Sequence, residues 1–230
     1  MAPPVPTADP ADTGAPAAPQ LPPDLAAQEL PGNSGDGSDL DRRLASALER
    51  AGHALRTLIW TQATAHGLSP IQVQLLLRLG VEPPERRRVG TLAAEFDLSA
   101  ATVSEALSAL RRKGLVEKQP VPGDKRGHVM APTEAGLAAA AALAHWPDPV
   151  TTHLATLPTE DKGRTLRLVL DLVGHLADTG VLSVARTCTT CRFFRRDEHD
   201  DSRRPHHCAL LDAPIGDPEL RVDCAEHQSA

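Results

Sequence analysis

The chain has 230 residues, which is enough for one or two domains with a hydrophobic core. Its formal net charge of −6 is carried by residues 1–39, which contain six acidic residues and neither Lys nor Arg. The rest of the chain is neutral, so a local basic surface for nucleic acid is not excluded. The absence of Tyr, with three Phe and two Trp, disfavours the aromatic stacking platforms of proteins that bind RNA or single strands.

The N-terminal segment is unlike the rest of the sequence. Residues 1–37 contain nine Pro and four Gly and few bulky apolar side chains. Because such a segment cannot bury enough apolar surface to offset its ordering entropy, we expect residues 1–38 to be a disordered Pro/Ala-rich tail. It also lacks the basic and apolar stretches of a secretory signal. No apolar run in the chain reaches the roughly 18 residues of a membrane helix, so we expect a cytoplasmic protein that has no membrane partner.

Helical periodicity begins after this tail. Apolar residues recur at helical spacing over 40–66, and Asp39 precedes them as a candidate N-cap. Ser69 and Pro70 then predict the start of a second helix over 71–79, since Ser is a favoured cap and Pro suits the first helical position. The first helix is long for a small domain, which indicates that it packs against a partner.

The central segment has the order of a winged helix-turn-helix. Short helical patterns over 89–96 and 100–113 are joined by three residues, and Ser99 can cap the second of them. Gly114 suits the residue that ends this helix. Two strands are expected over 115–119 and 128–131, around a turn rich in Pro and Gly, and Thr133 can cap the next helix. Two helices, a short turn and a β-hairpin are typical of a DNA-binding module.

A last helix is expected from a cap at Thr159 to about residue 178, with an apolar stripe like that of the first helix. One winged-helix domain would not need both flanking helices, so we expect them to form a homodimer. The predicted fold is therefore mainly α. It comprises a winged helix-turn-helix (α+β) domain with dimerisation helices over 39–180 and a small cysteine-rich metal-binding module over 187–228.

Several short motifs of the central segment are familiar in combination. They are Leu92-Ala93, Gly114-Leu115-Val116-Glu117 at the entry to the hairpin, Asp124-Lys125-Arg126 at its tip and Thr133-Glu134-Ala135-Gly136 after it. This segment resembles the winged-helix core of the MarR family of bacterial transcription regulators, and the resemblance extends more loosely over 40–180. It covers neither residues 1–37 nor residues 187–230.

The resemblance implies a homodimer that binds a pseudo-palindromic site in double-stranded DNA, with the second helix of the motif in the major groove and the wing in the minor groove. It also implies a crevice for a small-molecule effector, for which Trp60 and His66 are candidate lining residues. Glu105 departs from the family pattern, which often has Arg at this position, and we expect it to turn aside toward Arg111 or Arg112. Ten residues are the predicted DNA contacts: Arg86, Arg87, Arg88, Ser99, Ala101, Thr102, Ser104, Arg111, Lys125 and Arg126.

All four cysteines fall near the C-terminus. Cys188 and Cys191 form a C-x-x-C pair, and Cys208 and Cys224 follow after 16 and 15 further residues. Two of the three Phe and four of the ten His of the chain lie in the same segment. Four thiolates can hold zinc or an iron–sulfur cluster. The isolated second pair is unlike the two C-x-x-C knuckles of a zinc ribbon and favours a cluster; His207 and His227 are possible substitute ligands, and a reactive-thiol switch is a third interpretation.

These patterns predict a homodimeric, sequence-specific transcription regulator whose cysteine module senses redox state, iron or another metal. The alternative is a repressor that responds to a small ligand, with the cysteines as a structural zinc site. We do not expect an enzyme, because the C-x-x-C pair lacks the βαβ setting of a thiol oxidoreductase and we find no catalytic carboxylate pair, nucleophile elbow or phosphate loop in the sequence.

Overall fold

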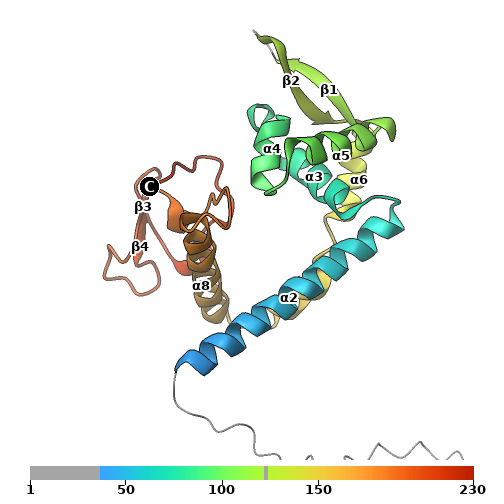
Figure 1. Cartoon of the computed structure of the whole chain (residues 1–230). Helices are drawn as coiled ribbons and strands as arrows, with labels where there is room; N and C mark the ends of the chain where they lie inside the picture. The colour runs from blue at the N-terminus through green and yellow to red at the C-terminus, as the bar shows by residue number, and fades with distance from the viewer. Residues whose placement is uncertain (1–36, 122–123) are drawn as a thin grey trace, which may run out of the picture. The chain divides into compact units, whose positions relative to one another are not determined.

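The computed structural model describes residues 37–121 and 124–230 (Figure 1), except for the side chains of residues 124–126. The predicted tail over 1–38 therefore falls almost entirely outside the described residues. The chain divides into two compact units, Met1–Arg50 and Ala51–Ala230. In the described ranges, none of the helices combines the length and the apolar character needed to cross a lipid bilayer.

The N-terminal and central elements follow the predicted order. Helix α2 (Gly37–Ala65) begins in the first unit and continues into the second. The second unit continues with α3 (Pro70–Val81), the 3₁₀ turn η1 (Pro84–Arg86), α4 (Val89–Glu95), α5 (Ala100–Arg112), β1 (Val116–Val121), β2 (Asp124–Pro132) and α6 (Glu134–Leu143). Its core is formed mainly by buried Leu and Val side chains of α3 and α5, with Leu92 and Leu143 packed against them.

Most of the predicted helix caps are confirmed. Ser69 forms a capping box with Gln72, and the side chains of Ser99 and Thr133 accept hydrogen bonds from the backbone N–H groups of Thr102 and Gly136. Gly114 ends α5 in the left-handed region, at φ +71°. The Ser69, Ser99 and Thr133 side chains each accept a hydrogen bond from a backbone N–H group that the start of a helix leaves unpaired. This interaction is local, so it can be predicted from the sequence.

Two predicted caps are wrong. Helix α2 begins two residues before Asp39, which lies inside the first turn and pairs with Arg43 at 3.3 Å. Helix α8 (Thr159–Asp178) has Pro158 at its N-cap position, and Thr159 is already helical. In both helices, acidic side chains in the first turn interact favourably with the helix dipole, so a capping side chain is not required there.

The hairpin is longer than predicted. β1 and β2 pair antiparallel from Val116↔Pro132 to Pro120↔His128, with an irregularity after Pro120. β1 extends two residues past its predicted end, and β2 begins four residues before its predicted start, because main-chain pairing continues into the polar tip of the hairpin. Gly136, in the first turn of α6, packs so closely on the Leu115 carbonyl that a Cβ atom would overlap it.

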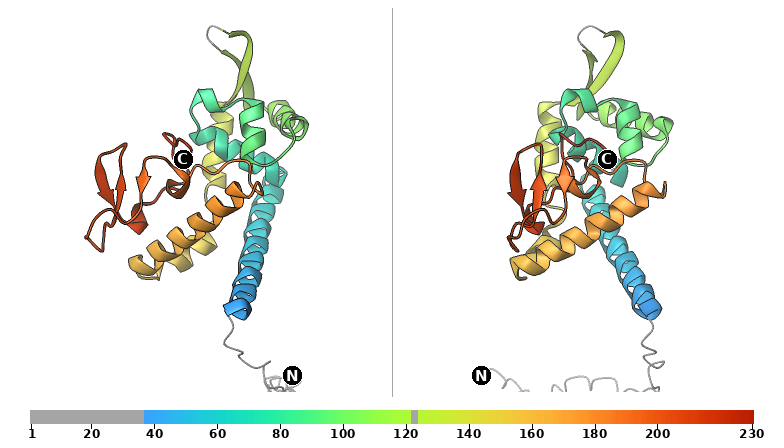
Figure 2. Two further views of the ribbon diagram at one scale, coloured as in Figure 1. Left: turned by 60° about the vertical axis from the view of Figure 1, so that its left-hand side comes forward. Right: turned by 90° about the vertical axis from the view of Figure 1, so that its left-hand side faces the viewer.

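The C-terminal elements are α7 (Asp148–Ala155), α8 and a small module. The module contains η2 (Cys188–Thr190), β3 (Phe194–Arg195), β4 (His206–Cys208), β5 (Ala213–Ile215) and η3 (Asp217–Glu219). Its three strands form one antiparallel sheet in the order β3-β4-β5. Coloured orange to red, the module lies against α8 (Figure 2), and both η2 and η3 contact that helix.

Candidate functional site

The N-terminal part of α5 presents the predicted reading residues on its surface. Ser99, Ala101, Thr102 and Ser104 are all exposed. The Ser99 hydroxyl, besides capping α5, lies 2.8 Å from the Thr102 hydroxyl, so these two groups are held together at the start of the helix. Glu105 is exposed on the same helix. Among the ion pairs of the described side chains, none joins Glu105 to Arg111 or Arg112, so the predicted sideways pairing is not found.

The base of the hairpin adds basic side chains to this surface. Arg111 and Ser104 of α5 line a small cavity of about 170 Å³ together with Lys118 of β1. Lys118 was not among the predicted contacts, because its position relative to α5 depends on the pairing of the hairpin. Lys125 and Arg126 belong to β2, but their side chains lie outside the described part of the chain.

The three consecutive arginines differ from one another. Arg86 binds two carboxylates, those of Glu82 at 3.1 Å and of Glu95. Its guanidinium thus interacts with buried anions, and its contact with the DNA backbone stays a prediction. Arg87 is half-buried and donates through Nε to the Glu82 carbonyl oxygen at 2.7 Å. Arg88 is exposed, and its predicted contact stays a prediction.

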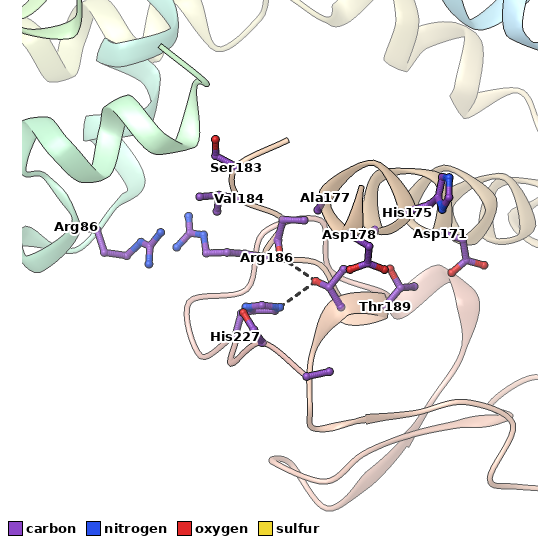
Figure 3. Close-up of a pocket in the computed structure, with 15 residues that line it drawn as sticks. Arg86, Asp171, His175, Ala177, Asp178, Ser183, Val184, Arg186, Thr189 and His227 are labelled. Atoms are coloured by element: carbon purple, nitrogen blue, oxygen red, sulfur yellow. Dashed lines mark hydrogen bonds between the residues drawn. The ribbon is translucent and has the colours of Figure 1, made fainter. Parts of the chain in front are cut away.

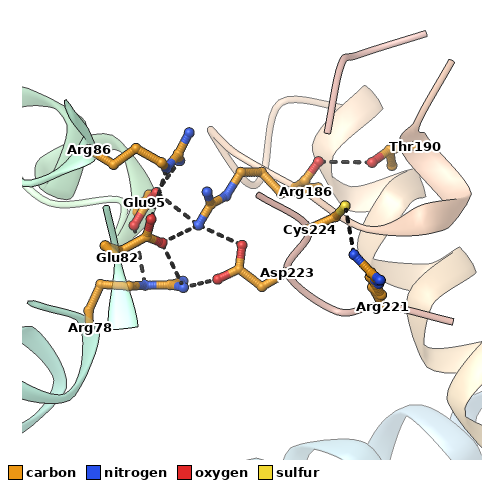
Figure 4. A network of polar contacts seen from close by, with 10 residues as sticks. Arg78, Glu82, Arg86, Glu95, Arg186, Thr190, Arg221, Asp223 and Cys224 are labelled. Atoms are coloured by element: carbon orange, nitrogen blue, oxygen red, sulfur yellow. Dashed lines mark hydrogen bonds and ion pairs between the residues drawn. The ribbon is translucent and has the colours of Figure 1, made fainter. Parts of the chain in front are cut away.

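Arg86 belongs to a buried ion network that joins the helix-turn-helix to the cysteine module (Figure 4). On the helical side, Glu82 and Glu95 have side chains only 5% and 3% exposed, and Arg78 pairs with both of them at 3.2 and 3.3 Å. On the module side, Arg186 pairs with Glu82, lies 3.3 Å from Glu95 and lies 2.5 Å from Asp223. Asp223 also pairs with Arg78.

The formal charges of this network balance, with three arginines and three carboxylates. Sequence reasoning missed it, although one signal was present. Arg186 lies two residues before Cys188, and Asp223 immediately precedes Cys224. The structure buries Arg186 to 8% exposure.

The four cysteines, which are distant in sequence, line one cavity of about 260 Å³. Phe193, Phe194, Leu210 and Ile215 form much of its remaining wall. All four cysteines are half-buried and none forms a disulfide. The cavity is thus a mainly apolar pocket that all four cysteines help to line. His207 and His227, the possible substitute ligands, are not among the residues that line it.

The sulfur atoms do not form a tight group of three or more. Among all possible metal-ligating side chains of residues 37–121 and 124–230, one group of three or more has ligand atoms that all lie within 4.8 Å of one another. This group consists of Glu198, His199 and His207. No three of the cysteine sulfurs are therefore as close as this. Burial, followed by the charges of Cys224, Cys208 and Cys191, raises the pKa of the Cys188 thiol.

Two N–H groups of Arg221 are directed at the sulfurs. Its backbone N–H donates to Cys188 Sγ at 3.2 Å, and its guanidinium lies 3.8 Å from Cys224 Sγ. Two backbone hydrogen bonds join the same two segments. The Cys188 N–H donates to the Arg221 carbonyl, and the Cys224 N–H donates to the Arg186 carbonyl. The segment that carries Arg186 is therefore tied directly to two of the cysteines.

The module is also fixed to α8. Thr189 of η2 donates to the Leu170 carbonyl at 3.0 Å. The buried His206 accepts a hydrogen bond at Nδ1 from Asp197 N, so its Nε2 carries the proton and donates to Asp217, which pairs with Arg167 of α8. A polar cavity of about 650 Å³ lies between Arg86, α8 and the module (Figure 3). Neither Trp60 nor His66, the predicted crevice residues, lines it.

Comparison with known proteins agrees with this architecture. The family model that matches the chain, over residues 66–127, is that of the MarR family. Residues 66–127 form a MarR-family domain. No curated protein sequence matches the chain.

Among solved structures, the MepR–DNA complex of Staphylococcus aureus matches with a TM-score of 0.51 at 16% identity, covering 58% of this chain and 97% of MepR. AbsC, a MarR family transcriptional regulator from Streptomyces coelicolor, matches with a TM-score of 0.54 at 21% identity, covering 61% and 96%. At these identities the likeness concerns the fold alone. The MarR domain has the DNA-binding fold of this family of transcription regulators, and the matched range ends before the cysteine module.

Proposed function

We propose that the chain is a homodimeric, sequence-specific transcription regulator whose cysteine module holds a metal centre that controls DNA binding. The observation that carries this proposal is the junction between the two parts. A MarR domain with an exposed reading helix is joined by buried ion pairs to a module in which four cysteines line one cavity. An isolated structural appendage would not require such a junction.

The proposed homodimer is supported by the apolar side chains that α2 and α8 expose. Of the 29 residues of α2, Ile59 and Ala63 are buried, whereas Leu40, Leu44, Leu55 and Trp60 are between 38% and 64% exposed. Leu168 and Leu172 of α8 are also exposed. Apolar side chains repeated along a helix are stabilised by burial against another helix, and a second copy of the same chain supplies one.

In the proposed complex the N-terminal part of α5 enters the major groove. Hydroxyl groups of Ser99, Thr102 and Ser104 can bond base edges or phosphates. Arg111, Lys118 and the basic residues of the wing supply the salt-dependent attraction to the phosphates. A dimer would place two such helices at half-sites roughly 34 Å apart.

For the metal centre we favour an iron–sulfur cluster over zinc. Tetrahedral zinc with Zn–S bonds of about 2.3 Å holds its four sulfurs only ~3.8 Å apart. No three of the cysteine sulfurs here lie within 4.8 Å of one another, which suits ligands distributed over several irons. Cys188, Cys191, Cys208 and Cys224 would hold the cluster, which would supply a one-electron redox change. Arg221 would direct N–H groups at the sulfurs, an arrangement that tunes the potential of such centres.

The proposed coupling follows two paths out of the module. Loss of the centre would release the backbone bonds that hold Arg186 and Asp223, and thereby the ion pairs to Glu82 and Glu95 beside α4. It would also loosen η2 on α8, a proposed dimer helix. Both changes alter how the two reading helices meet the half-sites, and a coupling of a few kcal/mol is enough for a regulatory switch.

The test begins with protein purified without oxygen, in which iron, labile sulfide and zinc per chain are measured. DNA duplexes selected from random sequence then serve as probes for binding before and after oxidation or chelation. We expect iron with sulfide, and an affinity that changes at least tenfold on removal of the centre. An unchanged affinity would overturn the sensing role. Stoichiometric zinc without iron would instead favour the repressor that responds to a small ligand, for which the polar cavity of about 650 Å³ is the place to screen.

A further inference from the structure

A second cluster of ligating side chains lies in the module, away from the cysteine cavity. One ligand atom each of Glu198, His199 and His207 lie within 4.8 Å of the other two. Glu198 and His199 belong to the loop after β3, and His207 is the central residue of β4. The backbone bond from His199 N to the Pro205 carbonyl holds this loop against the start of β4.

The strand geometry separates this cluster from the cysteines. Successive side chains of a strand point to opposite faces of the sheet, so His207 and its neighbour Cys208 face opposite ways. In the paired strands, His207 lies opposite Arg195 and Pro214, whereas Cys208 lies opposite Phe194 and Ala213. The residues that line the cysteine cavity include none of the cluster.

The positions of the two imidazoles fit a shared metal ion. His199 Nε2 lies 3.2 Å from His207 Nδ1. Two nitrogens on one tetrahedral zinc, each at 2.0–2.1 Å, are about 3.3 Å apart. The other ring nitrogen of His207, Nε2, lies 3.6 Å from the Asp212 carboxylate. A carboxylate behind the second nitrogen is the usual outer partner of a metal-bound histidine, which it orients and makes more basic.

Glu198 can supply the third ligand at little cost. Its carboxylate pairs with Arg195 at 3.2 Å, and the two side chains are 35% and 57% exposed. An ion pair this exposed contributes little to stability, so the carboxylate can turn from Arg195 toward a cation. His207 is only 9% exposed, which gives the site one anchored ligand and two on a loop.

We propose that Glu198, His199 and His207 form a second metal site, which binds a divalent transition-metal ion through two nitrogens and one oxygen. Imidazole with carboxylate suits Zn²⁺ and its neighbours in the series and is unlike the all-sulfur set of the cavity. The ion would join the loop after β3 to β4, and Asp212 would act as a positioning residue through His207. The site does not depend on what the cysteine cavity holds.

The test uses the full chain as purified, with Zn²⁺ and Co²⁺ as probes. The wild type is dialysed against each metal and then against buffer, and metal, iron and sulfide per chain are measured. We expect one metal ion per chain more in the wild type than in His199→Gln or in Glu198→Gln, with the iron and sulfide unchanged. Co²⁺ in the wild type should add visible bands of a nitrogen and oxygen site without sulfur-to-cobalt charge transfer. Asp212→Asn should weaken the affinity by about tenfold or more.

His153→Gln is the matched control, because His153 is an exposed histidine on α7, and it should bind like the wild type. Far-ultraviolet circular dichroism checks that each variant is folded. Equal metal content in the wild type and in folded His199→Gln and Glu198→Gln would overturn the site. The site would also be overturned if the Co²⁺ bands that these substitutions remove include thiolate-to-cobalt charge transfer. The lost ion would then have been bound in the cysteine cavity.

Discussion

At the residue scale, Arg186 is a buried cation that depends on its ion-pair partners. Its side chain is 8% exposed, and its guanidinium pairs with three carboxylates. A buried charge is tolerated only where partners replace its hydration, and removal of one partner leaves the others uncompensated. Arg186 therefore holds together residues that lie more than a hundred positions apart.

Substitution Arg186→Met tests this directly. It keeps much of the side-chain volume but leaves Glu82 and Glu95 with less positive charge around them. We expect a loss of about 3 kcal/mol or more in the free energy of unfolding, measured by urea denaturation. Arg164→Met is the control, since Arg164 forms an exposed pair with Glu160 and should change stability by less than about 1 kcal/mol. A similar small effect for both variants would contradict a buried, interdependent network.

Gly136 is constrained by space rather than by charge. A Cβ atom there would overlap the Leu115 carbonyl oxygen at the base of the wing. Gly136→Ala should therefore displace the hairpin from α6 and lower the unfolding temperature by several degrees. Gly90→Ala, in α4, should be neutral or slightly stabilising, because nothing lies within 4 Å of its added methyl group. Thermal unfolding followed by circular dichroism compares the two variants, and an equal effect would contradict the close packing.

At the scale of elements, three of the five predicted helix caps could be identified from the sequence, whereas long-range partners could not. Ser69, Ser99 and Thr133 each accept a hydrogen bond from the backbone N–H group three residues ahead, so their effect depends on the local sequence. The contact between Arg186 and Glu82 spans 104 positions and depends on how the module docks. The same distinction applies to the cysteines, because their residue type and clustering predicted a shared site, whereas the apolar side chains that line their common cavity required the fold.

The arginine run before α4 illustrates the same limit. Three consecutive arginines resemble one basic surface in sequence, but residues in a turn point in different directions. Arg86 meets buried carboxylates, Arg87 meets a carbonyl and Arg88 is exposed. Sequence pattern alone indicated a net charge at this place and not which of the three side chains could reach DNA.

Helix α5 carries the proposed sequence reading. Thr102→Ala removes an exposed hydroxyl but leaves the Ser99 cap, which bonds the Thr102 backbone N–H. We expect about tenfold weaker binding to the selected duplex and a relaxed preference at one base-pair position. Fluorescence anisotropy with single-base variants of the duplex measures this. Thr165→Ala on α8, also an exposed helical threonine, should bind as the wild type does. Equal loss on every sequence would indicate a phosphate contact instead.

At the scale of the whole molecule, the exposed leucines of α2 predict a dimer. Leu44→Asp and Leu55→Asp each place a charge in the proposed interface and should give a monomer. DNA binding should weaken, because the two reading helices are then no longer held together at the two half-sites. Sedimentation velocity measures the oligomeric state. Leu137→Asp is the control, because Leu137 is an exposed leucine on α6. A wild-type chain that sediments as a monomer would contradict the proposal, as would dimers of both α2 variants.

The ion pairs of the buried network constrain how such proteins can diverge. On the MarR side, Glu82 and Glu95 are paired with Arg78 and Arg86, and on the module side Arg186 is paired with Asp223. Each side is therefore neutral by itself, but Glu82 and Glu95 lose Arg186 as a partner if the module is absent. A descendant that lost the module would retain two buried carboxylates with fewer partners, and selection would replace them together. Substitutions at these positions should therefore covary across lineages. The residues at 82 and 95 should by themselves predict whether a related chain has the module.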